Sequence, residues 1–187
     1  MRTRLLLSLA VALLATSCKK DDPAAGLPPA TQVGANTGGC LINGERFVAT
    51  GWDSGSVLSN PVPPLSGGFF YDSLYYLLVD GVYKNRKVEL SLFFRSQIPG
   101  VYPLNQNTPT LLQGGLSRQT LSHATFTFHD AAGEAYVTSV QHTGRIELTY
   151  ANRNTGVSAG TFEFTAASTF DPGKTITITS GRFDSKQ

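Results

Sequence analysis

Apolar side chains recur at every second position in several short runs of the chain. In residues 88–95 the even-numbered positions are apolar, and residues 145–150, 161–166 and 175–179 repeat the alternation. A period of two places one side of a β-strand in a core and the other side in water. Clusters of Gly, Pro, Asn and Asp separate the runs, as turns between strands require.

These runs predict an all-β fold. No segment after residue 17 has a convincing helical period, so the crossover helices of a parallel α/β fold have no sequence to form from. We expect an antiparallel β-sandwich or a closed β-barrel of roughly ten strands, two architectures that produce the same alternation. Asn43-Gly44 predicts a hairpin turn, and the proline-containing segments 54–68 and 97–113 predict loops.

The first residues are typical of a secretory signal peptide. Arg2 and Arg4 precede an apolar run over residues 5–15, which is shorter than the roughly 20 residues that span a bilayer. Residues 14–18, Leu-Ala-Thr-Ser-Cys, resemble a bacterial lipobox. This resemblance implies that residues 1–17 are removed and that lipid, palmitate among its acyl chains, anchors Cys18 in a membrane; the alternative is an ordinary signal peptide with an incidental cysteine.

The residues after Cys18 suggest a location. Lys19-Lys20-Asp21-Asp22 resembles the surface-export signal of Bacteroidota lipoproteins, which implies the outer face of the outer membrane, with the periplasmic face as the alternative. Residues 18–38 are rich in Pro, Gly, Ala and polar residues and predict a flexible tether reaching about 25 Å. Residues 39–187 are expected to form a single all-β domain.

Charge and cysteine content exclude some classes of protein. The chain has 15 Lys and Arg against 13 Asp and Glu, and removal of Arg2 and Arg4 balances them. No basic run follows the tether, so nucleic acid is not an expected partner. With Cys18 lipidated, Cys40 has no disulfide partner and is expected to be a small buried hydrophobe.

Five short phrases, each a predicted strand beside a glycine, support a resemblance to a family. Their order resembles a group of Bacteroidota lipoproteins classed only as domains of unknown function, over most of residues 40–184. The resemblance implies an envelope location and a β domain, and it brings no chemistry. The phrases are residues 43–49, 100–104, 144–148, 160–164 and 181–184.

The three histidines do not predict a metal site. His123 and His129 share a strand face but lie roughly 20 Å apart at strand rise, too far to share one ion. His123 and His142 face each other only if Ala132-Gly133 forms a two-residue turn; a turn one residue longer puts them on opposite faces. Zinc sites need three or four ligands, so solvent-facing histidines are the favoured interpretation, and no cofactor is expected.

Catalytic motifs are also missing from the sequence. No Gly-x-Ser-x-Gly elbow occurs, and Glu45, Glu89, Glu147 and Glu163 are expected to point outward from amphipathic strands. Carboxylate pairs that form only in space are not visible to this reasoning. Asp72-Ser73-Leu74 resembles an O-glycosylation acceptor of Bacteroidota, although an ordinary turn explains the same three residues.

Aromatic residues give the most suggestive functional signal. Residues 74–79 are apolar at both parities, which describes a strand with no water-facing side. The favoured explanation is a central strand covered by the proline-containing loop; the other is an exposed surface that binds a carbohydrate, a peptide or a protein. The candidate ligand-binding residues are Trp52, Tyr71, Tyr75, Tyr76 and Tyr83.

We therefore expect a non-catalytic, lipid-anchored envelope protein that acts as a binding or interaction module. One alternative is an envelope hydrolase, which should gather at least two of His123, His142, Asp130 and Glu134, or other acids, in one cleft. Another is a purely structural protein with neither a cleft nor an aromatic patch. A closed barrel with an internal cavity would instead favour a small apolar ligand.

Overall fold

The computed structural model describes residues 22–53, 55, 60–71, 73–107 and 121–187. The predicted signal peptide and Cys18 lie outside these residues. Within the described ranges, no helix is long and apolar enough to cross a membrane. The strands are β1 (Thr37–Ile42), β2 (Glu45–Val48), β3 (Leu65–Phe70), β4 (Leu74–Tyr83), β5 (Arg86–Phe94), β6 (Gly100–Leu104), β7 (His123–Phe128), β8 (Ala135–Val137), β9 (Gly144–Asn152), β10 (Val157–Ser168) and β11 (Thr175–Lys186).

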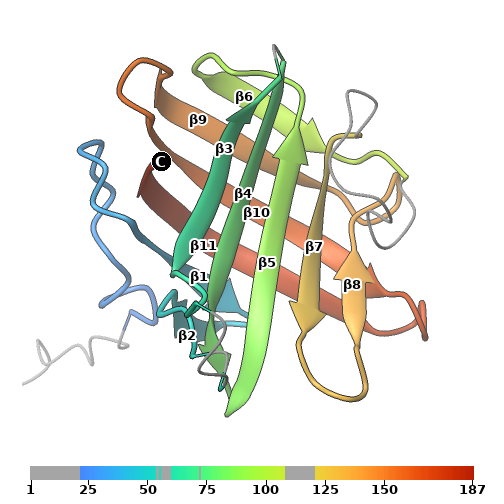
Figure 1. Ribbon diagram of the computed structural model, residues 1–187. Helices are drawn as coiled ribbons and strands as arrows, with labels where there is room; N and C mark the ends of the chain where they lie inside the picture. The colour runs from blue at the N-terminus through green and yellow to red at the C-terminus, as the bar shows by residue number, and fades with distance from the viewer. Residues whose placement is uncertain (1–21, 54, 56–59, 72, 108–120) are drawn as a thin grey trace, which may run out of the picture.

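The strands form one antiparallel sheet that curls back on itself. Its order is β2-β1-β11-β10-β8-β7-β5-β4-β3, and β9 pairs with β10 and with β6. Strands β3, β4, β5 and β7 make a front layer, behind which β9, β10 and β11 cross (Figure 1). The long strand β10 joins the layers, because its first part pairs with β9 and its last two residues pair with β8. The all-β prediction is confirmed, in the form of a half-barrel.

The core fills the space between the two layers. Alternate residues of β5, Val88, Leu90, Leu92 and Phe94, are fully buried, as the alternation predicts. Fully burying one such side chain stabilises a fold by about 1.5–3 kcal/mol. Cys40 is also buried in this core, which confirms the prediction of a small buried hydrophobe, and burial raises the pKa of its thiol.

The predicted hairpin between β1 and β2 is confirmed. Asn43 and Gly44 have φ angles of 50° and 83°, the left-handed conformation that a type I′ turn requires. The Asn43 side chain also accepts a hydrogen bond from the Thr177 amide at 2.9 Å, which fixes the turn against β11.

Each of the two proline-containing segments contains a strand, and only the strand in the second segment coincides with one of the strand phrases seen in the sequence. Strand β3 begins at Leu65, inside the first segment, and β6 occupies residues 100–104 of the second. Pro103 is tolerated because, among the described strands, β6 pairs with β9 alone, so its other edge needs no ladder hydrogen bond from the missing N–H.

The second half of the predicted tether lies against the domain. We call residues 24–36 the strap. The carboxylate of Asp184 on β11 accepts hydrogen bonds from the Thr31 hydroxyl (2.6 Å) and from the amides of Val33 (3.0 Å) and Gly34 (2.7 Å). The Leu27 side chain is buried as well. Composition alone predicted flexibility here, because Asp184, which accepts three hydrogen bonds from the strap, lies about 150 residues away in the sequence.

Candidate functional site

Two of the predicted ligand-binding tyrosines lie in the core. Tyr75 is fully buried and shares a hydrogen bond of 2.6 Å with Ser158, and burial raises the pKa of its phenol. Tyr83 is 9% exposed and donates to Glu45 at 3.3 Å. The hypothesis of a surface role is therefore wrong for Tyr75, because odd-numbered residues of β4 point inward between the layers.

The other candidate aromatics do not form one patch. Tyr76 points outward from β4 and is half-buried, and its ring is parallel to that of Phe93 at 6.4 Å. Phe93 in turn stacks on His123 at 4.7 Å, which completes a row across three strands. Tyr71 is exposed in the turn after β3, with a φ of 52°, and Trp52 lies in the segment before β3.

The histidines take different places from those expected. His123 is buried, with its Nδ1 at 2.7 Å from the Leu121 carbonyl oxygen, so the solvent-facing interpretation is wrong for it; burial lowers its pKa. Strands β7 and β8 pair around the turn 129–134, and His142 follows β8 without facing His123. In the described part of the chain, no three His, Cys, Asp or Glu side chains are placed to hold a metal ion.

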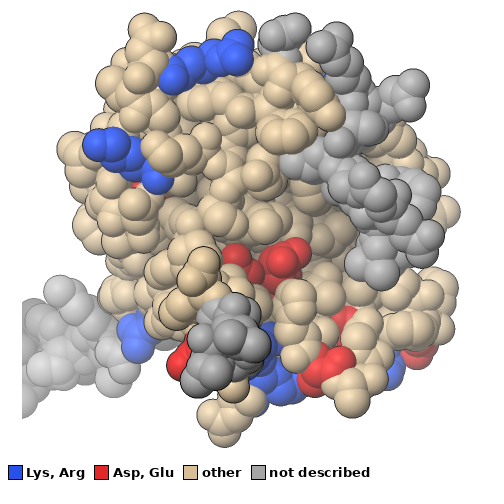
Figure 2. Space-filling model, in the orientation of Figure 1, with Lys and Arg blue, Asp and Glu red and all other residues tan. Residues whose placement is uncertain are grey.

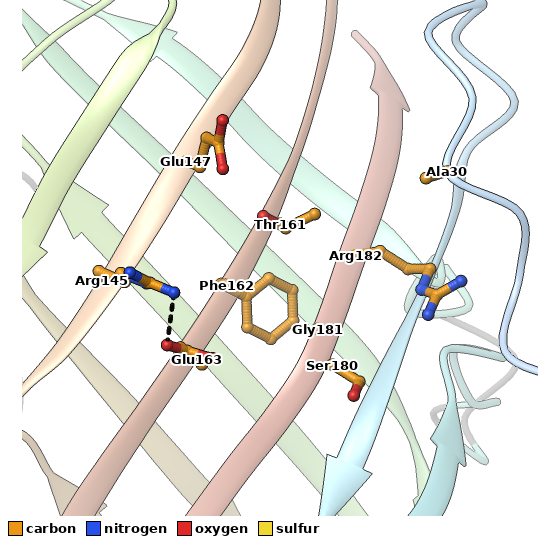
Figure 3. A pocket seen from close by; sticks show the side chains of 9 residues that line it. All are labelled: Ala30, Arg145, Glu147, Thr161, Phe162, Glu163, Ser180, Gly181 and Arg182. Carbon is orange, nitrogen blue, oxygen red and sulfur yellow. Dashed lines mark ion pairs between the residues drawn. The ribbon is translucent and has the colours of Figure 1, made fainter. Parts of the chain in front are cut away.

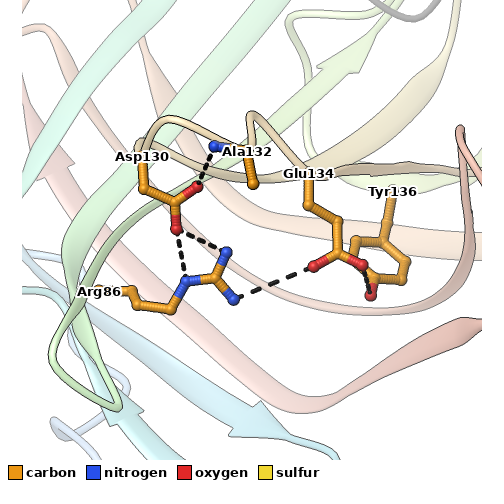
Figure 4. A network of polar contacts seen from close by, with 5 residues as sticks. All are labelled: Arg86, Asp130, Ala132, Glu134 and Tyr136. Atoms are coloured by element: carbon orange, nitrogen blue, oxygen red, sulfur yellow. Dashed lines mark hydrogen bonds and ion pairs between the residues drawn. The ribbon is translucent and has the colours of Figure 1, made fainter.

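Asp130 and Glu134 surround Arg86, as Figure 4 shows. The Arg86 guanidinium contacts Asp130 at 2.6 Å and Glu134 at 4.0 Å, and lies 3.4 Å from the centre of the Phe128 ring. The Tyr136 hydroxyl donates to Glu134 at 2.7 Å. Both acids contact Arg86, and Glu134 also accepts the hydrogen bond from Tyr136. Together these contacts hold the β7–β8 turn against the start of β5.

A shallow groove of about 360 Å³ crosses the outer face of β9, β10 and β11 (Figure 3). Three of its four charged side chains have protein partners: Arg145 pairs with Glu163 at 3.0 Å, and Arg182 donates to the Pro28 carbonyl at 3.5 Å. Glu147 and Glu163 point outward, as the alternation predicts. This arrangement resembles an ordinary solvated sheet face.

A different lateral row crosses the outer face of the front layer. Asp80 on β4 lies opposite Glu89 on β5, Glu89 lies opposite Thr127 on β7, and Thr127 lies opposite Ala135 on β8. Strands are spaced about 5 Å apart, so the row spans roughly 15 Å. In Figure 2, which views this face, acidic side chains lie in a depression near the middle.

Asp80 is the unusual member of this row. It is 1% exposed, and its Oδ1 is buried with no hydrogen-bond partner among the described residues. Its main chain is held firmly, because the carbonyl oxygen accepts hydrogen bonds from Thr50 and Gly51 and the amide donates to Pro64. Burial, and then the charge of Glu89, raise the pKa of Asp80 to about 7, partly opposed by His129.

Glu89 differs from Asp80 because both of its oxygens have partners. The Ser91 hydroxyl donates to one at 2.8 Å, and the His129 Nε2 lies 3.6 Å from the other. Burial alone would raise the pKa of Glu89, but the nearby His129 imidazole and the hydrogen bond from Ser91 bring it below its usual value. The same interaction with Glu89 raises the pKa of His129.

Trp52 reaches over this row from the edge of the layer. Its main chain pairs with Val62 at 3.1 and 2.8 Å, beside the end of β4. Its ring lies 5.2 Å from that of His129, which follows β7 two strands away. The indole therefore crosses β5 on the outer face. We call Trp52, Asp80, Glu89 and His129 the acidic hollow.

An apolar groove of about 670 Å³ adjoins the acidic hollow. Thr127 and His129 line it from β7, and Ala135 lines it from β8. Phe170, from the turn between β10 and β11, is 71% exposed and forms another part of its wall. His129 belongs to both features, so the acidic hollow and the apolar groove form one continuous surface.

The pairing of Asp80 with Glu89 carries no clear signal in the sequence. Lys84 and Asn85 have φ angles of 50° and 62°, so a two-residue turn joins β4 to β5 and sets Asp80 opposite Glu89. Lys-Asn lacks the glycine that marks such turns. Without that mark, the register of the two strands could not be read from the sequence.

Comparison with known proteins gives a family without an activity. Residues 72–185, which include β4, β5, β7 and β8, match the family described as domain of unknown function (DUF6252). No curated protein and no solved structure matches the chain.

Proposed function

We propose that this chain, which belongs to the DUF6252 family of domains of unknown function, is a non-catalytic binding module whose ligand site is the acidic hollow. In this proposal the ligand contacts Glu89, His129 and the Trp52 ring and supplies the hydrogen-bond donor that Asp80 lacks. The apolar groove beside His129 holds an adjoining part of the ligand. The site thus keeps Trp52 and replaces the four tyrosines of the sequence hypothesis.

The observation that carries the proposal is the unpartnered carboxyl of Asp80. Leaving a buried polar group without a partner costs about 1–3 kcal/mol, and more for a charged one. Among the described residues, the other such oxygen belongs to Gln97, whose amide nitrogen donates to three carbonyl oxygens around the turn after β3. Gln97 therefore has an evident structural role, whereas Asp80 has none that its contacts explain.

A ligand screen against matched variants tests the proposal. Saccharides and peptides would be screened by saturation-transfer NMR against the wild type, Glu89→Gln and Trp52→Ala, with Glu163→Gln on the back layer as the control. We expect ligands whose signals persist in Glu163→Gln and disappear in both hollow variants. Ligands that bind all four proteins equally would place the binding site elsewhere.

The proposed location is the outer membrane, through lipid on Cys18, with the domain at the cell surface and the periplasmic face as the alternative. Several acyl chains anchor a protein stably, whereas one binds only marginally. Labelled palmitate should enter the wild type and fail to enter Cys18→Ser. Surface proteolysis of intact cells should then distinguish the two faces of the membrane.

A second candidate function is hydrolysis. Two neighbouring carboxyl groups whose pKa values move in opposite directions are typical of a general acid and its partner, and Asp80 and Glu89 have this property. Release of a chromophore from aryl glycosides by the wild type, lost in both Asp80→Asn and Glu89→Gln, would favour this candidate. Binding without turnover would favour the module.

A further inference from the structure

We propose that the acidic hollow recognises its ligand through an alkylammonium group, which lies between Asp80 and Glu89. This inference rests on the proposed function, because it assigns ligand chemistry to the same site. The inference assigns a positive charge to the ligand and an alkyl chain to the part of the ligand that carries this charge.

The charges facing the hollow leave a place for one more cation. Asp80 and Glu89 contribute two carboxyl groups from β4 and β5, which lie opposite each other. The imidazole of His129 is engaged with Glu89 at 3.6 Å. The Lys87 ammonium donates to the Asp53 carbonyl oxygen at 2.9 Å. Neither cation is hydrogen-bonded to Asp80, whose Oδ1 remains without a donor.

A cation satisfies this arrangement better than a neutral donor does. A hydroxyl group gives Asp80 one hydrogen bond but leaves the repulsion between the two carboxylates in place. An ammonium group has three donors and a full charge, so it forms hydrogen bonds with Asp80 and Glu89 together and opposes their repulsion. The face of an indole also attracts cations, and Trp52 lies at the rim beside His129.

The apolar groove accounts for the alkyl part. Phe128, Ala135 and Phe170 line it on the far side of His129 from Asp80. A ligand with an ammonium end and an apolar body would place the charge in the hollow and the body in the groove. A lysine side chain in a peptide and an amino sugar both carry this ammonium chemistry, and the experiment separates the two sources.

Two pairs of probes, in each of which acetylation removes the charge of one nitrogen, test the inference. Titration calorimetry at neutral pH and low salt would compare Nα-acetyl-lysine amide with its Nε-acetylated form, and glucosamine with N-acetylglucosamine. Each probe would be added to the wild type, to Glu89→Gln and to Glu163→Gln. Circular dichroism verifies that both variants are folded. Glu163 is an outward acid on the back layer, so Glu163→Gln controls for the loss of one negative charge.

We expect at least one amine to bind the wild type about tenfold more tightly than its acetylated partner, by electrostatic attraction that salt weakens. Glu89→Gln should lose about tenfold in affinity for that amine, and Glu163→Gln should stay within about twofold. The lysine arm would indicate a peptide ligand, and the glucosamine arm an amino sugar.

Three results would overturn the inference, and they differ in what they leave standing. If acetylated and free amines bind equally and both need Glu89, the ammonium inference fails and the binding site stands. If the amine binds equally to the wild type and Glu89→Gln, the inference and the proposed site fail together. If no amine binds while a neutral ligand from the screen does, the hollow is not an ammonium site.

Discussion

Asp80 and Glu89 lie directly opposite each other on neighbouring strands, and among the described residues only the Glu89 side chain accepts a hydrogen bond. Like charges in this position destabilise a sheet. The two-residue turn at Lys84-Asn85 nevertheless fixes their register, and the pairing of Trp52 with Val62 holds an indole above them. The fold therefore maintains an unfavourable contact on its outer face. Functional sites typically contain such locally destabilising contacts.

The first prediction concerns the stability of the free protein. Asp80 binds a proton in the folded state up to about pH 7, but in the unfolded state only below about pH 4. Stability therefore falls as pH rises through this window, by at most about 4 kcal/mol. We expect Asp80→Asn, which abolishes this loss, to raise the free energy of unfolding at pH 8 by about 1–3 kcal/mol, because the buried amide still lacks partners.

Urea denaturation at pH 5 and pH 8 measures this effect. The wild type should lose more stability between these two values than Asp80→Asn does. The variant should keep a smaller fall, because the raised pKa of His129 contributes stability that is also lost as pH rises. If Asp80→Asn were less stable than the wild type at pH 8, the carboxylate would be a structural element.

A second prediction separates Tyr75 from Tyr76. Tyr75→Phe removes the hydrogen bond to Ser158 and leaves that buried hydroxyl unpaired, so we expect a loss of about 1–2 kcal/mol in unfolding free energy. Tyr76→Phe, on the half-buried outer face, should change it by less than about 0.5 kcal/mol. Thermal and urea denaturation of both variants measure this difference. Equal losses of stability in Tyr75→Phe and Tyr76→Phe would contradict the different positions of the two rings.

A third prediction concerns the strap over residues 24–36. Hydrogen bonds from Thr31, Val33, Gly34 and Ala35 outweigh burial and lower the pKa of Asp184. Asp184→Asn should weaken this attachment by about 2 kcal/mol, and acid should weaken it in the wild type as pH falls through the folded pKa. Hydrogen exchange followed by mass spectrometry should show faster exchange in the strap, while β4 and β5 stay protected. Unchanged exchange in the strap would mean that other contacts hold it.

The sequence predicted the fold class because one-sided burial leaves a local mark. Residues 88–94 show this alternation in the sequence. The Asn43-Gly44 turn is also recognisable locally, because Asn and Gly are the residues that favour positive φ angles. The strap carries no such mark, since its partner Asp184 lies about 150 residues away. Strand β3 was missed for a different reason: it begins inside the proline-containing segment 54–68, where no alternation marks a strand.

The site was harder to predict than the fold. Trp52 was named as a candidate, but its neighbours were not, because Glu89 alternates like any outward acid and Asp80 follows an apolar run. Their meeting depends on register, which the Lys84-Asn85 turn sets without an obvious signal. The tyrosines attracted attention because aromatic content is visible in a sequence, whereas the inward direction of Tyr75 depends on the same register.

The most direct measurement is the titration of the Asp80 carboxyl carbon by ¹³C NMR, in the free protein and with a ligand from the screen. The account predicts an apparent pKa near 7 in the free protein, and a fall in that pKa when a ligand brings a donor or a positive charge. An Asp80 that titrates near pH 4, with no change on adding ligand, would mean that its carboxylate is already solvated or paired. That result would contradict a ligand site in the acidic hollow.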